Sequence, residues 1–346
     1  MEKQVIAVPA STPYAVVLGS GLLDTLGAEL AHVASGSVFV VTDETVAPLY
    51  LSRAVQSLRS AGIAVSSLSV PAGESSKSMA CYEQLLGLLA ARGLTRSDTV
   101  LALGGGTVGD LAGFAAATYL RGVRFVQVPT TLLAMVDAAV GGKTALNLPQ
   151  GKNLVGAFHQ PALVLCDYAL PDTLPEDEFL NGCAEILKTA VLFDADLFSL
   201  LCKQGVGFDR ARVIAACIAH KCAVVCADET DLGRRQLLNL GHTVGHAIER
   251  CSAYVIPHGF AVAVGVCVMA RCFADDAERI TAAFRSFDLP TDTRFTAAEL
   301  AAAALADKKR RGDTITLAVP HRVGDCALLE LPVSALASVL ERGLLQ

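Results

Sequence analysis

Two lysines that each follow a glycine are the clearest chemical signal in this sequence of 346 residues. Lys143 and Lys152 stand nine positions apart, with Asp137 before the first and Asn153 directly after the second. Glycine lets the backbone approach a ligand closely, and lysine adds a compact positive charge. We therefore predict a pocket for a small, highly charged anion. A nucleoside triphosphate loop is excluded although Thr144 follows Lys143, because Asp137 stands where that loop needs its first glycine.

Three of the seven histidines fall within seventeen residues and indicate a metal site. His242 and His246 are one helical turn apart on one helix face, and His258 follows twelve residues later. Glu185, in an earlier helical stretch, is a fourth candidate ligand. Three such ligands with an open position are typical of a catalytic divalent metal, most simply zinc. The spacing leaves open which three bind it. The glutamate of a metalloprotease helix is absent, because Thr243 follows His242.

Further polar side chains surround these candidates in the sequence. They are the cations Lys188, Lys221 and Arg235, the last of them one helical turn before Asn239. Any one of them is more often a solvated surface charge, but in a stretch of otherwise apolar composition together they favour contact with an anionic substrate. The charged run 307–311, with Lys308 and Lys309, has two interpretations, a solvated surface run or a phosphate clamp.

A glycine-rich turn indicates a nucleotide site. Gly104, Gly106 and Gly109 fit G-x-G-x-x-G between a predicted strand and a predicted helix. The alternative is a tight strand–helix turn, which also uses glycine. Asp43, at the end of another predicted strand, is placed either to bind a ribose or to cap a helix. The polar loop 73–77 follows a further strand, and we predict a dinucleotide at this edge of the sheet.

The elements that position these residues in the first half are alternating strands and helices. Buried-strand patterns occur at residues 37–42, 63–70, 99–103, 124–128 and 162–166. Helical stretches are expected from about residue 46, at 78–92, and after Gly109. This alternation predicts a parallel sheet with helices on both faces, and ligands at the carboxyl ends of its strands.

A double-proline connection at residues 170–175 marks the expected domain boundary. Beyond it, helices are expected at 176–205, 208–228, 239–252, 258–287 and 296–307, with a short β patch at 314–319. We therefore expect an α/β protein of two domains. Residues 1–170 would form a Rossmann-like NAD-binding domain and residues 171–346 a mainly α-helical metal- and substrate-binding domain, with the active site between them.

Composition argues against several partners. The net charge of −6 disfavours nucleic acid and anionic membranes, and the longest uncharged apolar run, residues 260–270, is too short to span a bilayer. The eleven cysteines are odd in number and contain no CxxC pair. They are expected to be free thiols in a reducing environment. These features predict a cytoplasmic protein that acts on a small molecule.

Taken together, these motifs resemble the 3-dehydroquinate synthase family over essentially the whole chain. The segments that carry the resemblance are residues 42–46, 73–77, 104–110, 119–122, 129–133, 140–144, 151–153, 184–188, 239–246, 258–259 and 307–309. Each motif alone is weak evidence, whereas so many matches in one order are specific.

The resemblance implies an enzyme of the shikimate pathway that converts 3-deoxy-D-arabino-heptulosonate 7-phosphate into 3-dehydroquinate and phosphate. It implies catalytic NAD and one divalent metal per subunit, zinc or alternatively cobalt. Glu185, His242 and His258 would be the metal ligands, which leaves His246 for acid–base chemistry. A homodimer is implied, in which Arg121 reaches the phosphate of the neighbouring subunit's substrate.

The resemblance also assigns roles to the remaining residues. Catalytic roles are implied for His246, Asp137, Lys143, Lys188 and Asn239. Substrate binding is implied for Arg121, Lys152, Asn153, Lys221, Arg235, Lys308 and Lys309. Contacts with NAD are implied for Asp43, Glu74, Lys77, Gly105, Gly106, Asp110, Thr130, Thr131, Lys143, Lys152 and Thr173.

One residue departs from the family pattern. Phe260 follows His258 and Gly259 at a place where the family often has a glutamate. A carboxylate that orients the histidine ligand is therefore expected to be missing or replaced, which would affect metal affinity more than the type of reaction.

Three other functions compete with the synthase. Another NAD- and metal-dependent sugar phosphate cyclase would share the fold and both cofactors, but such relatives usually differ in the Gly-Gly-Lys-Thr segment that this chain keeps at 141–144. A metal-dependent polyol dehydrogenase would not need two glycine-flanked lysines. A noncatalytic nucleotide- or metal-binding module would not need this full set of acids, bases and cations.

Overall fold

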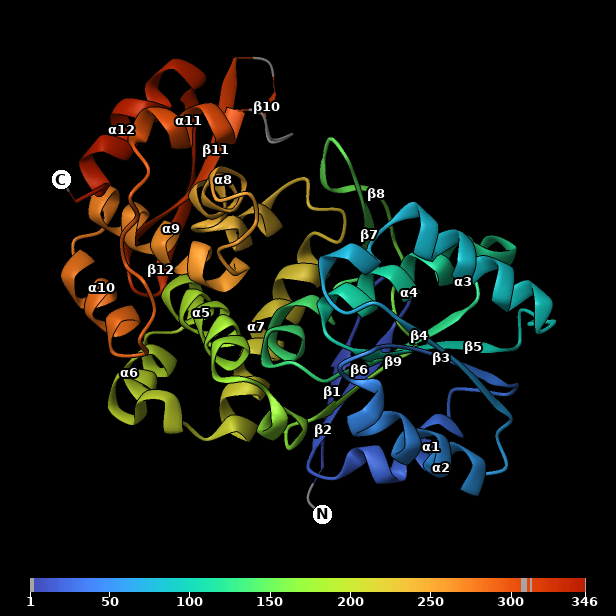
Figure 1. Cartoon of the computed structure of the whole chain (residues 1–346). Coiled ribbons are helices and arrows are strands. Elements are labelled where there is room, and N and C mark those ends of the chain that lie inside the picture. Colours follow the sequence, from blue (N-terminus) through green and yellow to red (C-terminus); the bar gives the residue numbers. More distant parts are fainter. Residues whose placement is uncertain (1–2, 306–309, 312, 346) are drawn as a thin grey trace. The chain divides into compact units, whose positions relative to one another are not determined.

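The computed structural model describes residues 3–305, 310–311 and 313–345 (Figure 1). The chain forms two compact units, one of residues Met1–Leu174 with Lys221–Thr230, the other of Pro175–His220 with Asp231–Gln346. The division runs through helix α7 (Arg210–Ala227). The sequence analysis assigned residues 221–230 to the second half, whereas their contacts group them with the first.

A seven-stranded sheet organises the first unit, in the order β1-β2-β9-β6-β5-β3-β4 (Figure 1). The strands are β1 (Gln4–Val8), β2 (Tyr14–Gly19), β3 (Val38–Asp43), β4 (Val65–Val70), β5 (Thr99–Gly104), β6 (Arg124–Pro129) and β9 (Leu163–Asp167). All pairings are parallel except that of β1 with β2. Every residue of β3 and β5 is buried, which explains why they read as continuous apolar runs. The predicted parallel-sheet architecture is confirmed, although the prediction omitted β1 and β2.

Four α-helices of this unit connect the strands. They are α1 (Leu26–Leu30), α2 (Ser52–Ser60), α3 (Met79–Ala91) and α4 (Gly106–Thr118). Helix α4 packs on β5 and β6, and its Leu111 belongs to the same buried core cluster as Phe39, Val100 and Phe125. The helix begins at Gly106, four residues before the start expected after Gly109, so two of the three motif glycines lie inside it.

A β-hairpin that the sequence analysis did not predict carries the two glycine-flanked lysines. Strand β7 (Lys143–Leu148) pairs antiparallel with β8 (Gly151–Phe158). No residue of β8 is fully buried, and two adjacent polar residues, Lys152 and Asn153, precede two adjacent apolar ones, Leu154 and Val155, between glycines. The segment therefore lacks the apolar run or strict alternation by which strands are found in a sequence.

The second unit is mainly helical. Besides the first part of α7 it contains α5 (Glu176–Phe193), α6 (Ala195–Gln204), α8 (His242–Cys251), α9 (His258–Phe273), α10 (Ala277–Arg285), α11 (Ala297–Leu305) and α12 (Leu336–Gly343). A small sheet joins β10 (Arg310–Arg311), β11 (Thr314–Arg322) and β12 (Asp325–Pro332). The predicted helix 176–205 is divided at Asp194, whose side chain accepts a hydrogen bond from the Leu197 backbone and caps α6. The predicted helix 258–287 is likewise two helices.

Close packing of α8 against α9 depends on glycine at two positions. Gly241 precedes α8 with a φ of 76°, a left-handed conformation that favours glycine. A side chain there would lie 2.7 Å from the backbone nitrogen of Val266 in α9, and one at Gly265 would clash with the Gly241 carbonyl. Each helix begins with a histidine, so this contact sets the spacing of His242 and His258.

Within the described part of the chain, no helix combines the length and the apolar character that crossing a membrane requires.

Candidate functional site

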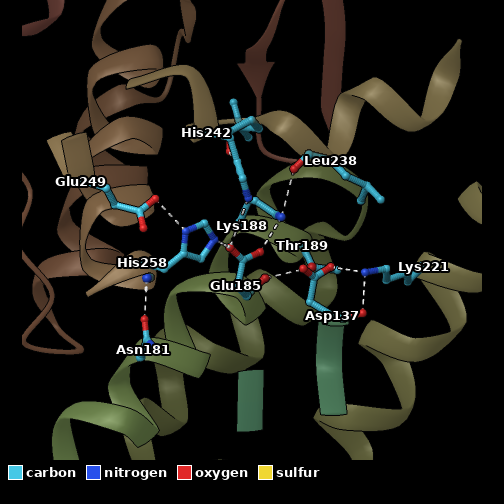
Figure 2. Close-up of polar contacts among 12 residues, drawn as sticks. Asp137, Asn181, Glu185, Lys188, Thr189, Lys221, Leu238, His242, Glu249 and His258 are labelled. Carbon is cyan, nitrogen blue, oxygen red and sulfur yellow. Dashed lines mark hydrogen bonds and ion pairs between the residues drawn. The ribbon is translucent and has the colours of Figure 1, made fainter. Parts of the chain in front are cut away.

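Three side chains from three helices converge in the second unit. Glu185 of α5 lies with its Oε1 3.7 Å from Nε2 of His242 and 3.6 Å from Nε2 of His258 (Figure 2). Glu185 is 1% exposed, and the three ligand atoms all lie within 4.8 Å of one another. The sequence left the choice among four candidates open, and this geometry brings together the three that the family resemblance implied.

The donor set fits a divalent metal. Zinc binds histidine nitrogen and carboxylate oxygen at about 2.0–2.2 Å, so two tetrahedral ligands stand about 3.4 Å apart, close to the observed separations. The remaining ring nitrogens are engaged: Nδ1 of His242 lies 3.1 Å from the Leu240 carbonyl, and Nδ1 of His258 lies 3.1 Å from the Glu249 carboxylate. Both acceptors require a proton on Nδ1, which leaves the Nε2 lone pairs for a metal.

Electrostatics support the same site. Burial raises the pKa of Glu185, but the charge of Lys188 and the hydrogen bond from His258 outweigh it and lower the pKa to about 2. Burial lowers the pKa of His258, but its hydrogen bonds to Glu185 and Glu249 outweigh this and raise the pKa to about 9. Lys188 is 1% exposed, pairs with Glu185 and donates to the Leu238 carbonyl at 3.0 Å. The cluster therefore holds a proton where a metal cation would bind.

Three other residues predicted for the site in this unit lie close to His242 in the sequence. His246 stands one turn after His242 in α8, with its ring centroid 5.8 Å from that of His258. Arg235, 1% exposed, and Asn239 belong to a 3-10 turn that directly precedes α8. Lys308 and Lys309 lie outside the described residues.

Apart from Lys143 and Lys152, which belong to the hairpin, the predicted NAD residues of the first unit lie at or after the carboxyl ends of its parallel strands. Asp43 ends β3, Glu74 and Lys77 follow β4, Gly105, Gly106 and Asp110 follow β5, Thr130 and Thr131 follow β6, and Thr173 follows β9. The backbone of Thr130 donates to the Gly104 carbonyl at 3.0 Å, which joins two of these ends. The carboxyl edge of the sheet is where the sequence analysis expected a ligand.

Lys77 connects the loop after β4 with helix α4 and with the β7–β8 hairpin. Its amino group lies 2.6 Å from Oδ2 of Asp110 and also donates to Oδ1 of Asn153 in the hairpin. Asn147 reinforces this connection, because it donates to Glu74 at 2.6 Å and accepts from the Asn153 backbone at 2.9 Å. Burial raises the pKa of Asp110 more than Lys77 lowers it. The predicted nucleotide loop and the predicted substrate hairpin thus share one hydrogen-bond network.

Asp43 has the geometry of a cap. Its Oδ1 accepts hydrogen bonds from the backbones of Thr45 and Val46, each at 2.8 Å. Of the two roles that the sequence left open for Asp43, these bonds match the helix cap. Its position at the end of β3 is also the one expected of a ribose-binding residue.

The two glycine-flanked lysines occupy opposite ends of the hairpin. Lys143 pairs with Phe158 at the open end, whereas Lys152 follows the turn. Lys143 and Leu148 are five positions apart along β7, a rise of about 16 Å. The structure brings Lys221 to Asp137, whose carboxylate and backbone carbonyl both accept from the lysine (Figure 2).

Arg121 is exposed at the turn after α4, with a φ of 65°, directly after Leu120 with a φ of 51°. Two successive non-glycine residues with positive φ are uncommon and mark a specialised turn.

Sequence reasoning missed two polar residues that hold His258. The Glu249 carboxylate accepts a hydrogen bond from Nδ1 of His258, and the side-chain oxygen of Asn181 accepts one from the Gly259 backbone (Figure 2). A signal was present for both. Glu249 stands seven residues after His242 and Asn181 four residues before Glu185, so each shares a helix face with a ligand.

Comparison with solved structures defines the class. The chain superposes on 2-deoxy-scyllo-inosose synthase with a TM-score of 0.88 at 24% identity, covering 99% of this chain and 100% of that one. It superposes on 2-epi-5-epi-valiolone synthase from Streptomyces hygroscopicus subsp. jinggangensis with a TM-score of 0.86 at 28% identity, covering 94% and 95%. The latter structure has NAD⁺ and Zn²⁺ bound. The chain has the fold of the sugar phosphate cyclases.

Sequence comparison narrows the class to a family. The family models for the N-terminal and C-terminal parts of 3-dehydroquinate synthase match residues 67–181 and 182–310. The 3-dehydroquinate synthase of Rhodospirillum rubrum is 46% identical over 335 residues, which cover 90% of this chain and 87% of that protein. This chain belongs to the 3-dehydroquinate synthase family.

Proposed function

We propose that this protein converts 3-deoxy-D-arabino-heptulosonate 7-phosphate into 3-dehydroquinate and phosphate. The observation that carries the proposal is the convergence of Glu185, His242 and His258, with both remaining ring nitrogens engaged, in a chain of this family. The reaction would proceed by alcohol oxidation, phosphate elimination, ketone reduction, ring opening and an intramolecular aldol step. The hydride removed first would be returned in the later reduction, so NAD would be needed only in catalytic amount.

The proposal assigns one cofactor to each unit. NAD would bind at the carboxyl edge of the first unit's sheet and supply the hydride acceptor, and a divalent metal held by Glu185, His242 and His258 would acidify a substrate hydroxyl. Nitrogen and oxygen donors in this number favour zinc, with cobalt as the alternative. The relative with 28% identity, which has NAD⁺ and Zn²⁺ bound, supports this assignment.

The chain's own side chains would bind the substrate and move its protons. Lys143, Lys152 and Arg235 would offset the charges of the substrate carboxylate and phosphate, since lysine and arginine bind such groups with charge-assisted hydrogen bonds. His246, with its ring near those of both metal-binding histidines, would carry protons to and from the reacting oxygens. The Asp137–Lys221 pair would position a proton-accepting carboxylate.

We propose further that the enzyme acts as a homodimer in the cytoplasm. The exposure of Arg121 at its positive-φ turn supports a role for this side chain outside its own subunit. All eleven cysteines are free thiols, which suits a reducing compartment.

The test is an assay of the purified protein with the heptulosonate phosphate, a catalytic amount of NAD and zinc. We expect phosphate and dehydroquinate in equal amounts, without net accumulation of NADH. Steady NADH production from a polyol without phosphate release would instead identify a dehydrogenase. Phosphate release without dehydroquinate would identify a different sugar phosphate cyclase, such as one of the valiolone type.

A further inference from the structure

The ring of His258 is held from two sides. Its Nε2 faces Oε1 of Glu185 at 3.6 Å, and its Nδ1 lies 3.1 Å from Oε2 of Glu249 (Figure 2). Glu249 is 3% exposed and comes from α8, whereas His258 opens α9. The carboxylate therefore reaches across the α8–α9 contact to the side of the ring opposite the metal donors.

The direction of the hydrogen bond between His258 and Glu249 determines which ring nitrogen can bind a metal. An ionised carboxylate only accepts hydrogen bonds, so Nδ1 of His258 must carry the proton and Nε2 is the nitrogen available to a metal. For His242 the same function falls to the Leu240 carbonyl, a neutral backbone group. His258 thus depends on a side chain that substitution can remove, whereas His242 does not.

The backbone of His258 is fixed independently of its ring. The next residue, Gly259, donates its N–H to the side-chain oxygen of Asn181 in α5, and a side chain at Gly259 would clash with the Asn181 carbonyl. Because Asn181 holds the start of α9 in place, loss of Glu249 would release the orientation of the ring more than the position of the helix.

Phe260, two residues after His258, offers no hydrogen-bond acceptor from its side chain, and the carboxylate beside the ring comes from the neighbouring helix α8.

We propose that Glu249 is the positioning residue that orients the ring of His258 for the metal. The inference rests on the proposed function only in assuming that Glu185, His242 and His258 bind a divalent metal. Glu249 would act through His258 and would not itself contact the metal or the substrate.

The test measures zinc affinity of the metal-free protein by competition with a chromophoric chelator, without NAD or substrate. We expect Glu249→Leu to weaken zinc binding about 10- to 100-fold, the usual effect of removing the partner of a histidine ligand. Glu249→Gln keeps an acceptor for Nδ1 and should recover most of the affinity. Glu278→Gln in α10, where the side chain is 85% exposed, is the matched control and should bind zinc as the wild type does.

Three results would overturn the inference. They are wild-type zinc affinity in a folded Glu249→Leu protein, a Glu249→Gln protein no better than Glu249→Leu, and a second zinc equivalent in the wild type that is lost on substitution of Glu249. The last would make Glu249 a ligand, together with His246 and His258, whose donor atoms also lie within 4.8 Å of one another. If Glu249→Leu does not fold, a Glu249→Gln affinity between that of the wild type and a tenfold loss supports the inference, and a larger loss overturns it.

The outcome is separable from that of the proposed function. The expected pattern of zinc affinities with no dehydroquinate formed would overturn the function alone. Dehydroquinate formation with zinc affinities independent of Glu249 would overturn this inference alone.

Discussion

Two carboxylates, one in each unit, respond in opposite ways to similar surroundings. Asp110 in the first unit and Glu185 in the second each pair with a lysine, Lys77 and Lys188, and burial raises the pKa of both. The pKa of Asp110 nevertheless ends above its ordinary value, whereas that of Glu185 falls to about 2.

The second neighbour explains the difference. Beside Asp110 it is Glu74, whose negative charge adds to the effect of burial and outweighs the positive charge of Lys221. Beside Glu185 it is His258, which contributes both a hydrogen bond and a positive charge. The paired lysine therefore does not by itself set the direction in which the carboxylate pKa shifts, and the sign of the next neighbouring charge decides it. A site that must bind a metal cation gains from the second arrangement, because its ligand is already ionised.

The largest effect should come from neutralising the metal-site carboxylate. Glu185→Gln removes an anionic ligand, and we expect turnover to fall about a thousandfold, equivalent to about 4 kcal/mol of transition-state stabilisation. Metal content measured by elemental analysis should fall with it. A Glu185→Gln protein that keeps one metal per chain and full turnover would remove Glu185 from the ligand set.

Removing each lysine should distinguish the two pairs by stability. Lys188→Met leaves the buried charge of Glu185 with His258 as its remaining partner, so we expect a loss of about 3 kcal/mol in the free energy of unfolding. Lys77→Met should cost less, about 1 kcal/mol, because the Asp110 side chain is 22% exposed and water can solvate it. Urea unfolding of the metal-free proteins measures both. Equal losses would mean that the two carboxylates are equally desolvated.

The dependence of stability on pH should have opposite signs at the two carboxylates. A lowered folded-state pKa gives Glu185 a stabilising contribution that is present above about pH 4.5 and is lost as the pH falls toward 2. A raised pKa gives Asp110 a contribution that declines as the pH rises above its ordinary value of 3.8.

With rising pH, therefore, Glu185→Gln should become less stable relative to the wild type, and Asp110→Asn more stable. Unfolding of the metal-free proteins at several pH values between about 3 and 5 measures both differences. Slopes of the same sign for the two variants would contradict the comparison.

The smallest effect should come from the second neighbour of Asp110. Glu74→Gln keeps a side-chain acceptor for Asn147 but removes the negative charge, so the pKa of Asp110 should move downward. NMR of ¹³C-labelled aspartate can follow this titration. An unchanged Asp110 titration in Glu74→Gln would leave burial as the sole cause of the raised pKa.

Much of the fold could be predicted because its buried strands have recognisable apolar sequence patterns. Strands β3 and β5 are buried along their whole length, so both appear in the sequence as apolar runs. The β7–β8 hairpin could not be found in this way, since its pairing depends on the partner strand and on the packing of α4 against β7. The break between α5 and α6 depends on a single side chain, the cap formed by Asp194.

The site was predictable where spacing within one helix carries the information. The separation of four residues places His242 and His246 on the same face of a helix. Glu185 and His258 are 73 positions apart in the chain. No local pattern could show that they meet, and only the family resemblance chose them from the four candidate ligands. The link between Lys77 and Asn153 was not predicted at all, because it arises from the return of the hairpin to the loop after β4.

The glycines that let α8, α9 and α5 approach one another also bear on how this protein tolerates mutation. Substitution at Gly241, Gly259 or Gly265 would force apart helices that deliver His242, His258 and Glu185. These positions should therefore prove as intolerant as the ligands in a survey of random variants, although none of the three contributes a side chain to the chemistry. In this unit, therefore, the same glycine positions determine both the geometry of the metal ligands and the close packing of the helices.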